Sequence, residues 1–130
     1  MPREVLNPDR LFNSLQYGFS QIAMGVGSKF VTISGQVGWD ENQAIDNTLE
    51  AQTLKALSNL GIAMQEAGGS LDDILLLHIY IVESVMNDTA PIRDALKQVF
   101  PSAPPATSWI GVPRLANIDF LIEIEALGVI

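Results

Sequence analysis

The stretch Ile74-Leu75-Leu76-Leu77-His78-Ile79-Tyr80-Ile81-Val82 has the length and residue types of a β-strand, and its two faces differ. One face is purely aliphatic: Leu75, Leu77, Ile79 and Ile81. The other face is apolar but carries polar tips: Leu76, His78, Tyr80 and Val82. Because alternate residues of a strand point to opposite faces, we expect the aliphatic face to lie under a helix. The second face would be bare in a monomer and is a candidate for self-association.

A helix is predicted on each side of this strand. Residues 48–67 form the longer one, with Asn47 as its N-cap and Gly68-Gly69 as its end, because glycine adopts the left-handed cap readily. Its apolar face has helical spacing: Leu49, Ala56, Leu57, Leu60, Ala63, Met64 and Ala67. The second helix covers residues 90–100, with Pro91 in its first turn. Both helices therefore have a face that needs a sheet to cover it.

The remaining strands fall before and after these helices. Residues 19–26 and 30–34 are predicted as two strands joined by a hairpin, because Gly25-Val26-Gly27-Ser28-Lys29 is typical of a tight turn. Residues 106–112 and 119–129 also alternate as strands do. The order ββ-α-β-α-ββ predicts an α+β fold, with both helices on one face of the sheet.

The composition narrows the class of protein. The chain has 130 residues, enough for one domain over residues 1–130 with its own core. The net charge is −8, with 15 acidic and 7 basic residues, which argues against nucleic-acid binding. Only 17% of residues are charged, which suggests that part of the surface is buried against other copies of the chain. Without cysteine and with one histidine, the chain has no structural zinc site.

No targeting signal is visible at the start of the sequence, and the longest apolar stretch is too short to span a bilayer. We therefore expect a cytoplasmic protein that does not bind a membrane.

Few residues point to chemistry by themselves. His78 could be the base of a triad, but a histidine in an apolar strand is more often hydrogen-bonded within the structure or an interface. Alternation places Glu123 and Glu125 on one face, where they either meet solvent and ion partners or hold a ligand proton. Ser34-Gly35 ends a strand, and its hydroxyl and amides could bind a small anion or carbonyl, or simply form a turn.

Several short motifs occur together in a specific order. They are Phe19-Ser20-Gln21, Ile33-Ser34-Gly35-Gln36, Ala51-Gln52, Leu60 to Gly68, Leu71 to Ile74, Pro105-Ala106-Thr107-Ser108 and Ile122-Glu123-Ile124-Glu125-Ala126. In this combination the chain resembles the RidA/YjgF family, also called endoribonuclease L-PSP or reactive-intermediate deaminases. The resemblance implies a chorismate-mutase-like fold, with helices on one face of a mixed sheet, and a homotrimer with ligand sites between subunits.

The resemblance also implies a chemistry. Deaminating members of the family hydrolyse imines or enamines, among them 2-imino acids, without a cofactor or a metal. Their arginine, in a Pro-Ala-Arg-Ser motif, binds the substrate carboxylate, while a glutamate and a tyrosine help to place water and substrate. In this sequence Thr107 stands at the arginine position and Phe19 at the tyrosine position, with Tyr17 two residues away. A hydroxyl cannot replace a bidentate, charged clamp, so deamination of 2-imino acids is not expected.

The other family positions are kept or have a substitute. Glu123 is the predicted catalytic residue, and Ser34 and Gly35 are retained as binding residues. Trp109 would share a strand face with Thr107 and fill the pocket. Arg93 is the nearest substitute cation, unless it is a surface residue of the second helix paired with Asp88 or another acid.

These positions predict a RidA-like homotrimer whose intersubunit pockets take a small carbonyl, imine or enamine compound and hydrolyse it with Glu123 orienting the water. The alternative is a non-catalytic module that binds a small ligand or a partner on the same trimer. A ribonuclease is disfavoured by the acidic charge and by the scattered basic residues.

Overall fold

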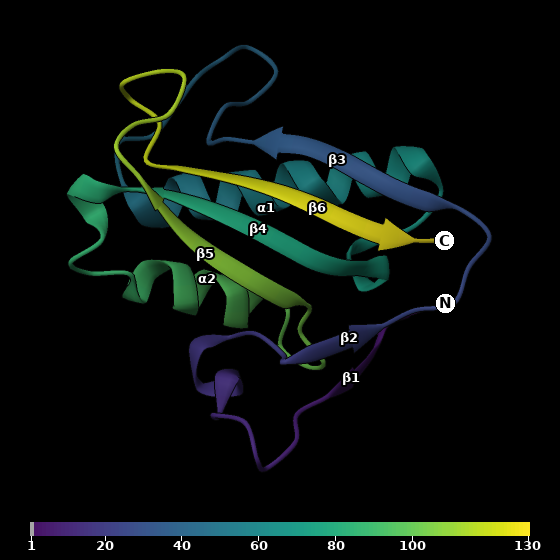
Figure 1. The fold of residues 1–130 in the computed structure, drawn as a ribbon. Coiled ribbons are helices and arrows are strands. Elements are labelled where there is room, and N and C mark those ends of the chain that lie inside the picture. The colour runs from purple at the N-terminus through teal and green to yellow at the C-terminus, as the bar shows by residue number, and fades with distance from the viewer. Residues whose placement is uncertain (1) are drawn as a thin grey trace.

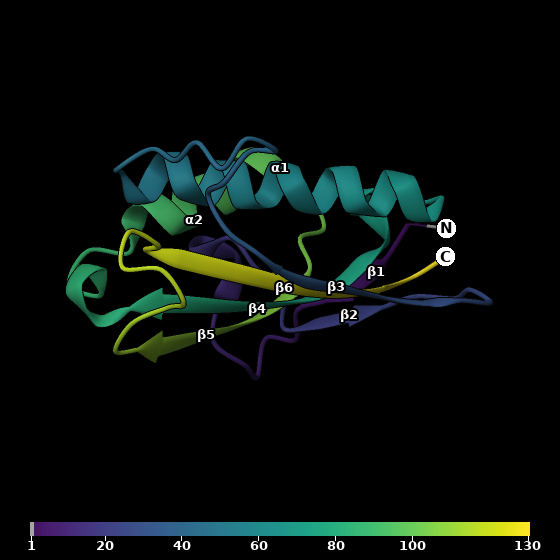
Figure 2. The ribbon, with the colours of Figure 1, turned by 90° about the horizontal axis from the view of Figure 1, so that it is seen from above.

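The computed structural model describes residues 2–130 and places two helices against one face of a four-stranded sheet (Figures 1 and 2). The strand order is β3-β6-β4-β5. Their bounds are β3 Phe30–Gln36, β4 Ile74–Val82, β5 Ala106–Val112 and β6 Ile122–Val129. Strand β4 is antiparallel to β6 and parallel to β5, so the sheet is mixed. The predicted α+β architecture with helices on one face of a mixed sheet is confirmed.

The helices are α1, Leu49–Ala67, and α2, Ala90–Val99, close to their predicted bounds. The N-cap of α1 is Thr48, whose hydroxyl accepts from the Ala51 amide at 3.1 Å, so the prediction of Asn47 was wrong by one residue. Asparagine and threonine can both act as N-caps, and the backbone conformation at the start of the helix determines which of two neighbouring residues does so. Gly68 ends α1 with φ 101°, as predicted.

The alternation in β4 sets the core. Leu77, Ile79 and Ile81 are fully buried under the helices, as the sequence predicts. Leu75 is not: the register between β4 and β6 shifts between Ile74 and Leu76, so Ile74 is buried in the core instead. Leu75 lies against Gly25. A bulge of this kind reverses the faces of a strand on one side of it, and period-two alternation alone cannot locate it.

The predicted hairpin between residues 19–26 and 30–34 is wrong. The first segment forms only a short strand, β2 (Ile22–Met24), which pairs with β1 (Glu4–Leu6) in a separate two-stranded sheet, whereas β3 pairs with β6. Between them, the amides of Ser28 and Lys29 both donate to the Ile130 carbonyl at 2.9 Å. The glycine-rich segment therefore connects two separate sheets and is hydrogen-bonded to Ile130. A local turn sequence does not by itself determine which strand a β-strand pairs with.

Three short 3-10 helices complete the element order: η1 Ser14–Tyr17, η2 Leu71–Asp73 and η3 Glu83–Val85. Arg3 is buried and fastens the β1 segment to the main layers, donating to the carbonyls of Ala103 at 2.6 Å and Leu71 at 2.7 Å. None of the helices described over residues 2–130 is long and apolar enough to cross a membrane.

No helix of residues 2–130 covers the face of the main sheet that points away from α1 and α2 (Figure 2). We call it the open face. Cross-strand pairing places on it Thr32 of β3, Leu76, His78 and Tyr80 of β4, and Glu123, Glu125 and Leu127 of β6. The polar tips predicted for this face of β4 are therefore gathered beside two carboxylates.

Candidate functional site

One group of predicted site residues forms a pocket at the outer edge of β5. This aromatic pocket, of about 360 Å³, is lined by Tyr17, Phe19, Thr89, Thr107 and Trp109. All five lining side chains are uncharged. The rings of Phe19 and Trp109 lie 6.2 Å apart, and the Trp109 indole Nε1–H donates to the Thr107 hydroxyl oxygen at 3.0 Å. That oxygen is occupied as an acceptor, so the Thr107 O–H remains a donor for a ligand carbonyl or nitrogen.

Local backbone geometry brings Phe19 to this pocket. Gly18, with φ 90°, ends η1, and its amide donates to the Leu15 carbonyl at 3.1 Å. The chain then turns towards β5, where the Ser20 amide donates to the Pro105 carbonyl at 3.1 Å and Ser20 forms a parallel bridge with Ala106. A left-handed residue at this position favours glycine.

A second group lies at the end of β3. The register of β3 against β6 shifts between Ile33 and Gln36, which is a bulge that holds Ser34 and Gly35. The side chain of Glu123 occupies the space above Gly35: a Cβ at that glycine would fall 2.7 Å from Glu123 Cδ. Glycine is required here for close approach rather than for its dihedral angles. We call Ser34, Gly35 and Glu123 the glutamate corner.

The glutamate corner is held by a buried side chain that sequence reasoning did not single out as functional. Gln52 of α1 accepts from the Leu121 amide at 2.8 Å and donates to the carbonyls of Asp119 and Asp46, each at 2.9 Å. Its side chain is 1% exposed. Gln52 therefore fixes the entry into β6, two residues before Glu123. The only signal in the sequence was its place in the Ala51-Gln52 motif.

The two groups lie on opposite faces of the sheet. Thr107 and Trp109 pair with Leu77 and Ile79, whose side chains point to the helices. Glu123 pairs with Tyr80 on the open face. Within one chain the structure therefore brings Phe19, Thr107 and Trp109 together, and separately Gly35 and Glu123, with Ser34 next to Gly35 in the bulge, but it does not join the two groups.

Arg93 belongs to neither group. Its Nε–H donates to the Asp94 carboxylate at 3.0 Å, and both side chains are substantially exposed. Asp88, the other partner considered, accepts from the Ala90 amide at the start of α2. The residue of this region that lines the aromatic pocket is Thr89, which the sequence did not suggest.

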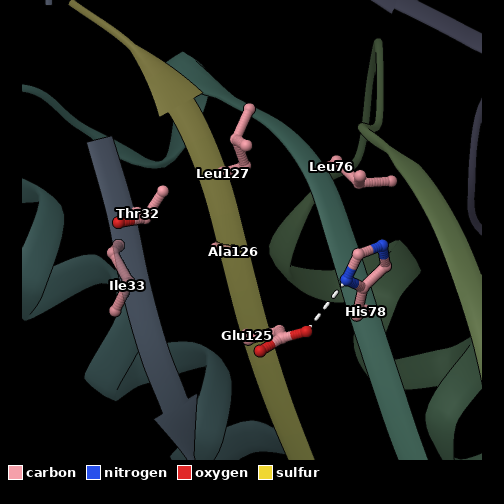
Figure 3. A pocket seen from close by; sticks show the side chains of 7 residues that line it. All are labelled: Thr32, Ile33, Leu76, His78, Glu125, Ala126 and Leu127. Carbon is pink, nitrogen blue, oxygen red and sulfur yellow. Dashed lines mark hydrogen bonds and ion pairs between the residues drawn. The ribbon is translucent and has the colours of Figure 1, made fainter. Parts of the chain in front are cut away.

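A third cluster lies on the open face. The carboxylate oxygen Oε1 of Glu125 is 2.9 Å from His78 Nδ1 (Figure 3). The same oxygen accepts from the Tyr80 hydroxyl at 2.6 Å. The hydrogen bonds from Tyr80 and His78 lower the pKa of Glu125, and the same bond with Glu125 raises the pKa of Tyr80. His78 is thus a hydrogen-bonded residue of the open face, as the alternative to a triad base predicts. Among residues 2–130 no cluster of three or more metal-ligand side chains is found.

The structure is that of an α+β protein with two helices on one face of a mixed sheet and a glutamate side chain packed over a glycine. Comparison with known proteins then identifies its family. Residues 13–130 match the family model described as endoribonuclease L-PSP. A RutC family protein of Pyrococcus abyssi is 30% identical over 108 residues, or 82% of either chain. A 2-iminobutanoate/2-iminopropanoate deaminase of Dermatophagoides farinae is 30% identical over 110 residues, or 83% of either chain.

The fold has close counterparts among solved structures. A Rid-family protein of unknown function from Yersinia pestis superimposes with a TM-score of 0.91 at 34% identity, covering 100% of both chains. With the family model matched over nearly the whole chain, this chain belongs to the RidA/YjgF family.

Proposed function

We propose that this chain, as a single domain of residues 1–130, assembles into a cytoplasmic homotrimer that binds a neutral carbonyl, imine or enamine compound between subunits and hydrolyses it. The observation that carries the proposal is the division of the predicted site between two faces. The aromatic pocket offers rings and a hydroxyl donor without a charge, and the glutamate corner offers a carboxylate without a substrate pocket. If the open face of one subunit contacts the β5 edge of the next, the carboxylate of Glu123 and the uncharged aromatic pocket would together form one site.

The chemistry follows from the two parts. The ring faces of Phe19 and Trp109 hold the apolar part of the ligand, and the Thr107 O–H donates to its nitrogen or oxygen. Glu123 orients a water and accepts one of its protons as the water oxygen bonds to the imine carbon. Glu123 passes this proton to the nitrogen, which gives a carbinolamine. The C–N bond then breaks as the carbinolamine hydroxyl loses its proton to the nitrogen, so that ammonia or an amine leaves and the carbon becomes a carbonyl. No step needs a cofactor or a metal.

A neutral substrate fits this arrangement better than a 2-imino acid. The five residues of the aromatic pocket include no cation for a carboxylate, and Arg93 is paired with Asp94. The net charge of −8 would also repel an anionic substrate. The deaminase relative supports hydrolysis of an imine as the reaction class, but its 2-imino acid substrates are not carried over.

Imine decay tests this proposal. A flavin amine oxidase releases a neutral imine from 2-phenylethylamine, and an amino-acid oxidase releases a 2-imino acid from leucine. We expect purified protein to accelerate decay of the neutral imine only, and Glu123→Gln to abolish the acceleration while the exposed Glu66→Gln control retains it. Thr107→Arg should extend the activity to the imino acid.

Two results would overturn it. Decay of the neutral imine at the buffer rate, with saturable binding of the carbonyl product, would favour the non-catalytic binding module, which the bond between Thr107 and Trp109 also suits. A monomer mass by light scattering at micromolar concentration would exclude a site between subunits.

A further inference from the structure

Four aromatic rings form a row that begins outside the aromatic pocket and ends inside it. The ring of Phe12 lies 6.5 Å from that of Tyr17 and 6.2 Å from that of Phe19, and the ring of Phe19 lies 6.2 Å from that of Trp109. The chain has five phenylalanines, two tyrosines and two tryptophans, so four of its nine aromatic residues gather here. We call these four residues the aromatic row. Phe12 is the member that neither the sequence nor the lining of the pocket singles out.

Phe12 is held in place although 62% of it is exposed. Its backbone carbonyl accepts from the side-chain amide of Gln21 at 3.0 Å. The backbone amide of Gln21 in turn donates to the side-chain oxygen of Asn7 at 2.8 Å. The ring of Phe12 meets that of Phe19 at 70°, which is the edge-to-face arrangement that aromatic pairs favour. Phe12 therefore supports one side of Phe19, whose other side faces Trp109.

The other end of the row is fixed by a hydrogen bond. The Trp109 indole Nε1–H donates to the Thr107 hydroxyl oxygen at 3.0 Å, which sets the orientation of the indole. Because an indole has a single N–H, a ligand then meets Trp109 only through its ring atoms. The edge of an aromatic ring is positive and its face is negative, so an aryl group gains from tilted contacts with these rings. A saturated ring of the same size gains from burial alone.

We propose that the aromatic row makes the pocket selective for ligands that carry an aryl group. The aryl ring packs against Phe19 and Trp109, and Phe12 is a positioning residue that acts through Phe19. Arylalkyl imines then become the substrate class, and this step rests on the function proposed above, whereas the selective binding of an aryl group does not. Since that function already requires a ligand to enter this pocket, the inference needs no additional open surface in the assembled protein.

The size of the pocket and the strength of aromatic contacts set the expected effect. Its volume of about 360 Å³ is at the lower end for small-molecule sites, which suits one ring with a short chain. The gain of an aromatic pair beyond its burial corresponds to a preference of about tenfold for an aryl over a saturated ring.

Titration of the intact protein with phenylacetone and with cyclohexylacetone tests the proposal. These two neutral ketones match in shape and have no C=N bond to hydrolyse. Protein with isotope-labelled tryptophan gives one indole N–H signal from Trp109 and one from Trp39, which Trp39→Phe assigns. Trp39 packs against Phe120 at 4.8 Å and serves as the internal reference. We expect phenylacetone to shift the Trp109 signal saturably, with a dissociation constant about tenfold below that of cyclohexylacetone, while the Trp39 signal stays in place.

Variants test the row itself through the ratio of the two dissociation constants, which a merely structural role would not change. Phe19→Leu should bring the two ketones to equal affinity. Phe12→Leu, which keeps an apolar side chain but removes the supporting ring, should reduce the aryl preference to about threefold. Phe30→Leu is the matched control, because its exposed ring at the start of β3 lies outside the row, and it should leave the ratio within about twofold of wild type. Circular dichroism and thermal melting confirm that each variant is folded.

Equal affinity of the two ketones for wild type, equal shifts of the Trp39 and Trp109 signals, or the absence of saturable binding would each overturn the proposal. So would an aryl preference that survives in Phe19→Leu. Hydrolysis is scored separately, on imines that a flavin amine oxidase releases from 2-phenylethylamine and 2-cyclohexylethylamine. Aryl-selective binding without accelerated decay of either imine would count against the function proposed for Glu123 alone. Equal kcat/KM for both imines would count against the aryl selectivity alone.

Discussion

The aromatic pocket and the glutamate corner differ in how their polar groups are satisfied. In the pocket, the Trp109 indole and the Thr107 hydroxyl bind each other, and the surrounding groups are neutral. In the corner, the Glu123 carboxylate lies over the backbone of Gly35 and forms no hydrogen bond with any residue between 2 and 130. In the function proposed above, the pocket therefore holds the ligand and the corner acts on it. The difference also means that substitutions in the two regions should affect different properties.

The largest effect is expected where the corner depends on a buried polar group. Gln52→Ala leaves the Leu121 amide and two carbonyls without their partner, which should lower the free energy of unfolding by about 3 kcal/mol. Urea unfolding at one fixed protein concentration measures it. The exposed helix variant Gln65→Ala is the control and should change stability by less than about 0.5 kcal/mol. Equal stabilities of the two variants would show that Gln52 does not hold the entry to β6.

The next largest effect separates activity from stability at the corner. Gly35→Ala adds a Cβ that overlaps the end of the Glu123 side chain, which can move aside. We expect little loss of stability but a fall of about 100-fold in kcat/KM for neutral imine hydrolysis, because a catalytic group displaced by about 1 Å loses its geometry. Gly111→Ala is the matched control, since its Cβ would meet Met86 at an ordinary 3.7 Å. Unchanged kcat/KM in Gly35→Ala would contradict the role given to Glu123.

The sequence predicts the buried half of the molecule better than the site. Alternation in β4 from Leu77 onward and in β6, most of the helix face of α1 and the glycine end at Gly68 each depend on near neighbours in the chain and are found, although Ala67 of the predicted helix face is exposed. The failures depend on contacts between distant segments. The hairpin failed because β2 pairs with β1, and Leu75 was misplaced because a bulge shifts the register at Ile74.

The candidate site shows the same limit. The resemblance supplies Glu123 and Thr107 as positions, but only the pairing of Thr107 with Leu77 and of Glu123 with Tyr80 shows that they point to opposite faces. Likewise, the sequence places Glu125 on a strand face, whereas its bonds to His78 and Tyr80 depend on the register of two strands.

A smaller effect is expected in the aromatic pocket. Thr107→Val removes the acceptor of the Trp109 indole N–H without changing the shape of the side chain much, and should cost about 1 kcal/mol of stability because both residues are only half-buried. Thr107→Ser keeps the hydroxyl and should retain most of that bond. Tryptophan fluorescence during urea unfolding reports on both, and the prediction fails if the serine and valine variants are equally destabilised.

The smallest effect on stability is expected for Glu125, which is hydrogen-bonded, in contrast to Glu123 on the same strand, which is not bonded to any residue between 2 and 130. Tyr80 and His78 lower the pKa of Glu125, so this carboxylate stabilises the fold at pH values above its unfolded-state pKa, and the contribution is lost as the pH falls through the folded-state pKa. The side chains of His78 and Glu125 are partly exposed, so we expect this contribution to be no more than about 1 kcal/mol.

Thermal unfolding from neutral pH down to about pH 3 should show the stabilities of wild type and Glu125→Gln converging on acidification. Tyr80→Phe should reduce the difference at neutral pH, because the tyrosine hydroxyl is the larger cause of the lowered pKa. Parallel curves for wild type and Glu125→Gln through the acid range would mean that these hydrogen bonds do not favour the ionised form, and the distinction between the two glutamates would then depend on position alone.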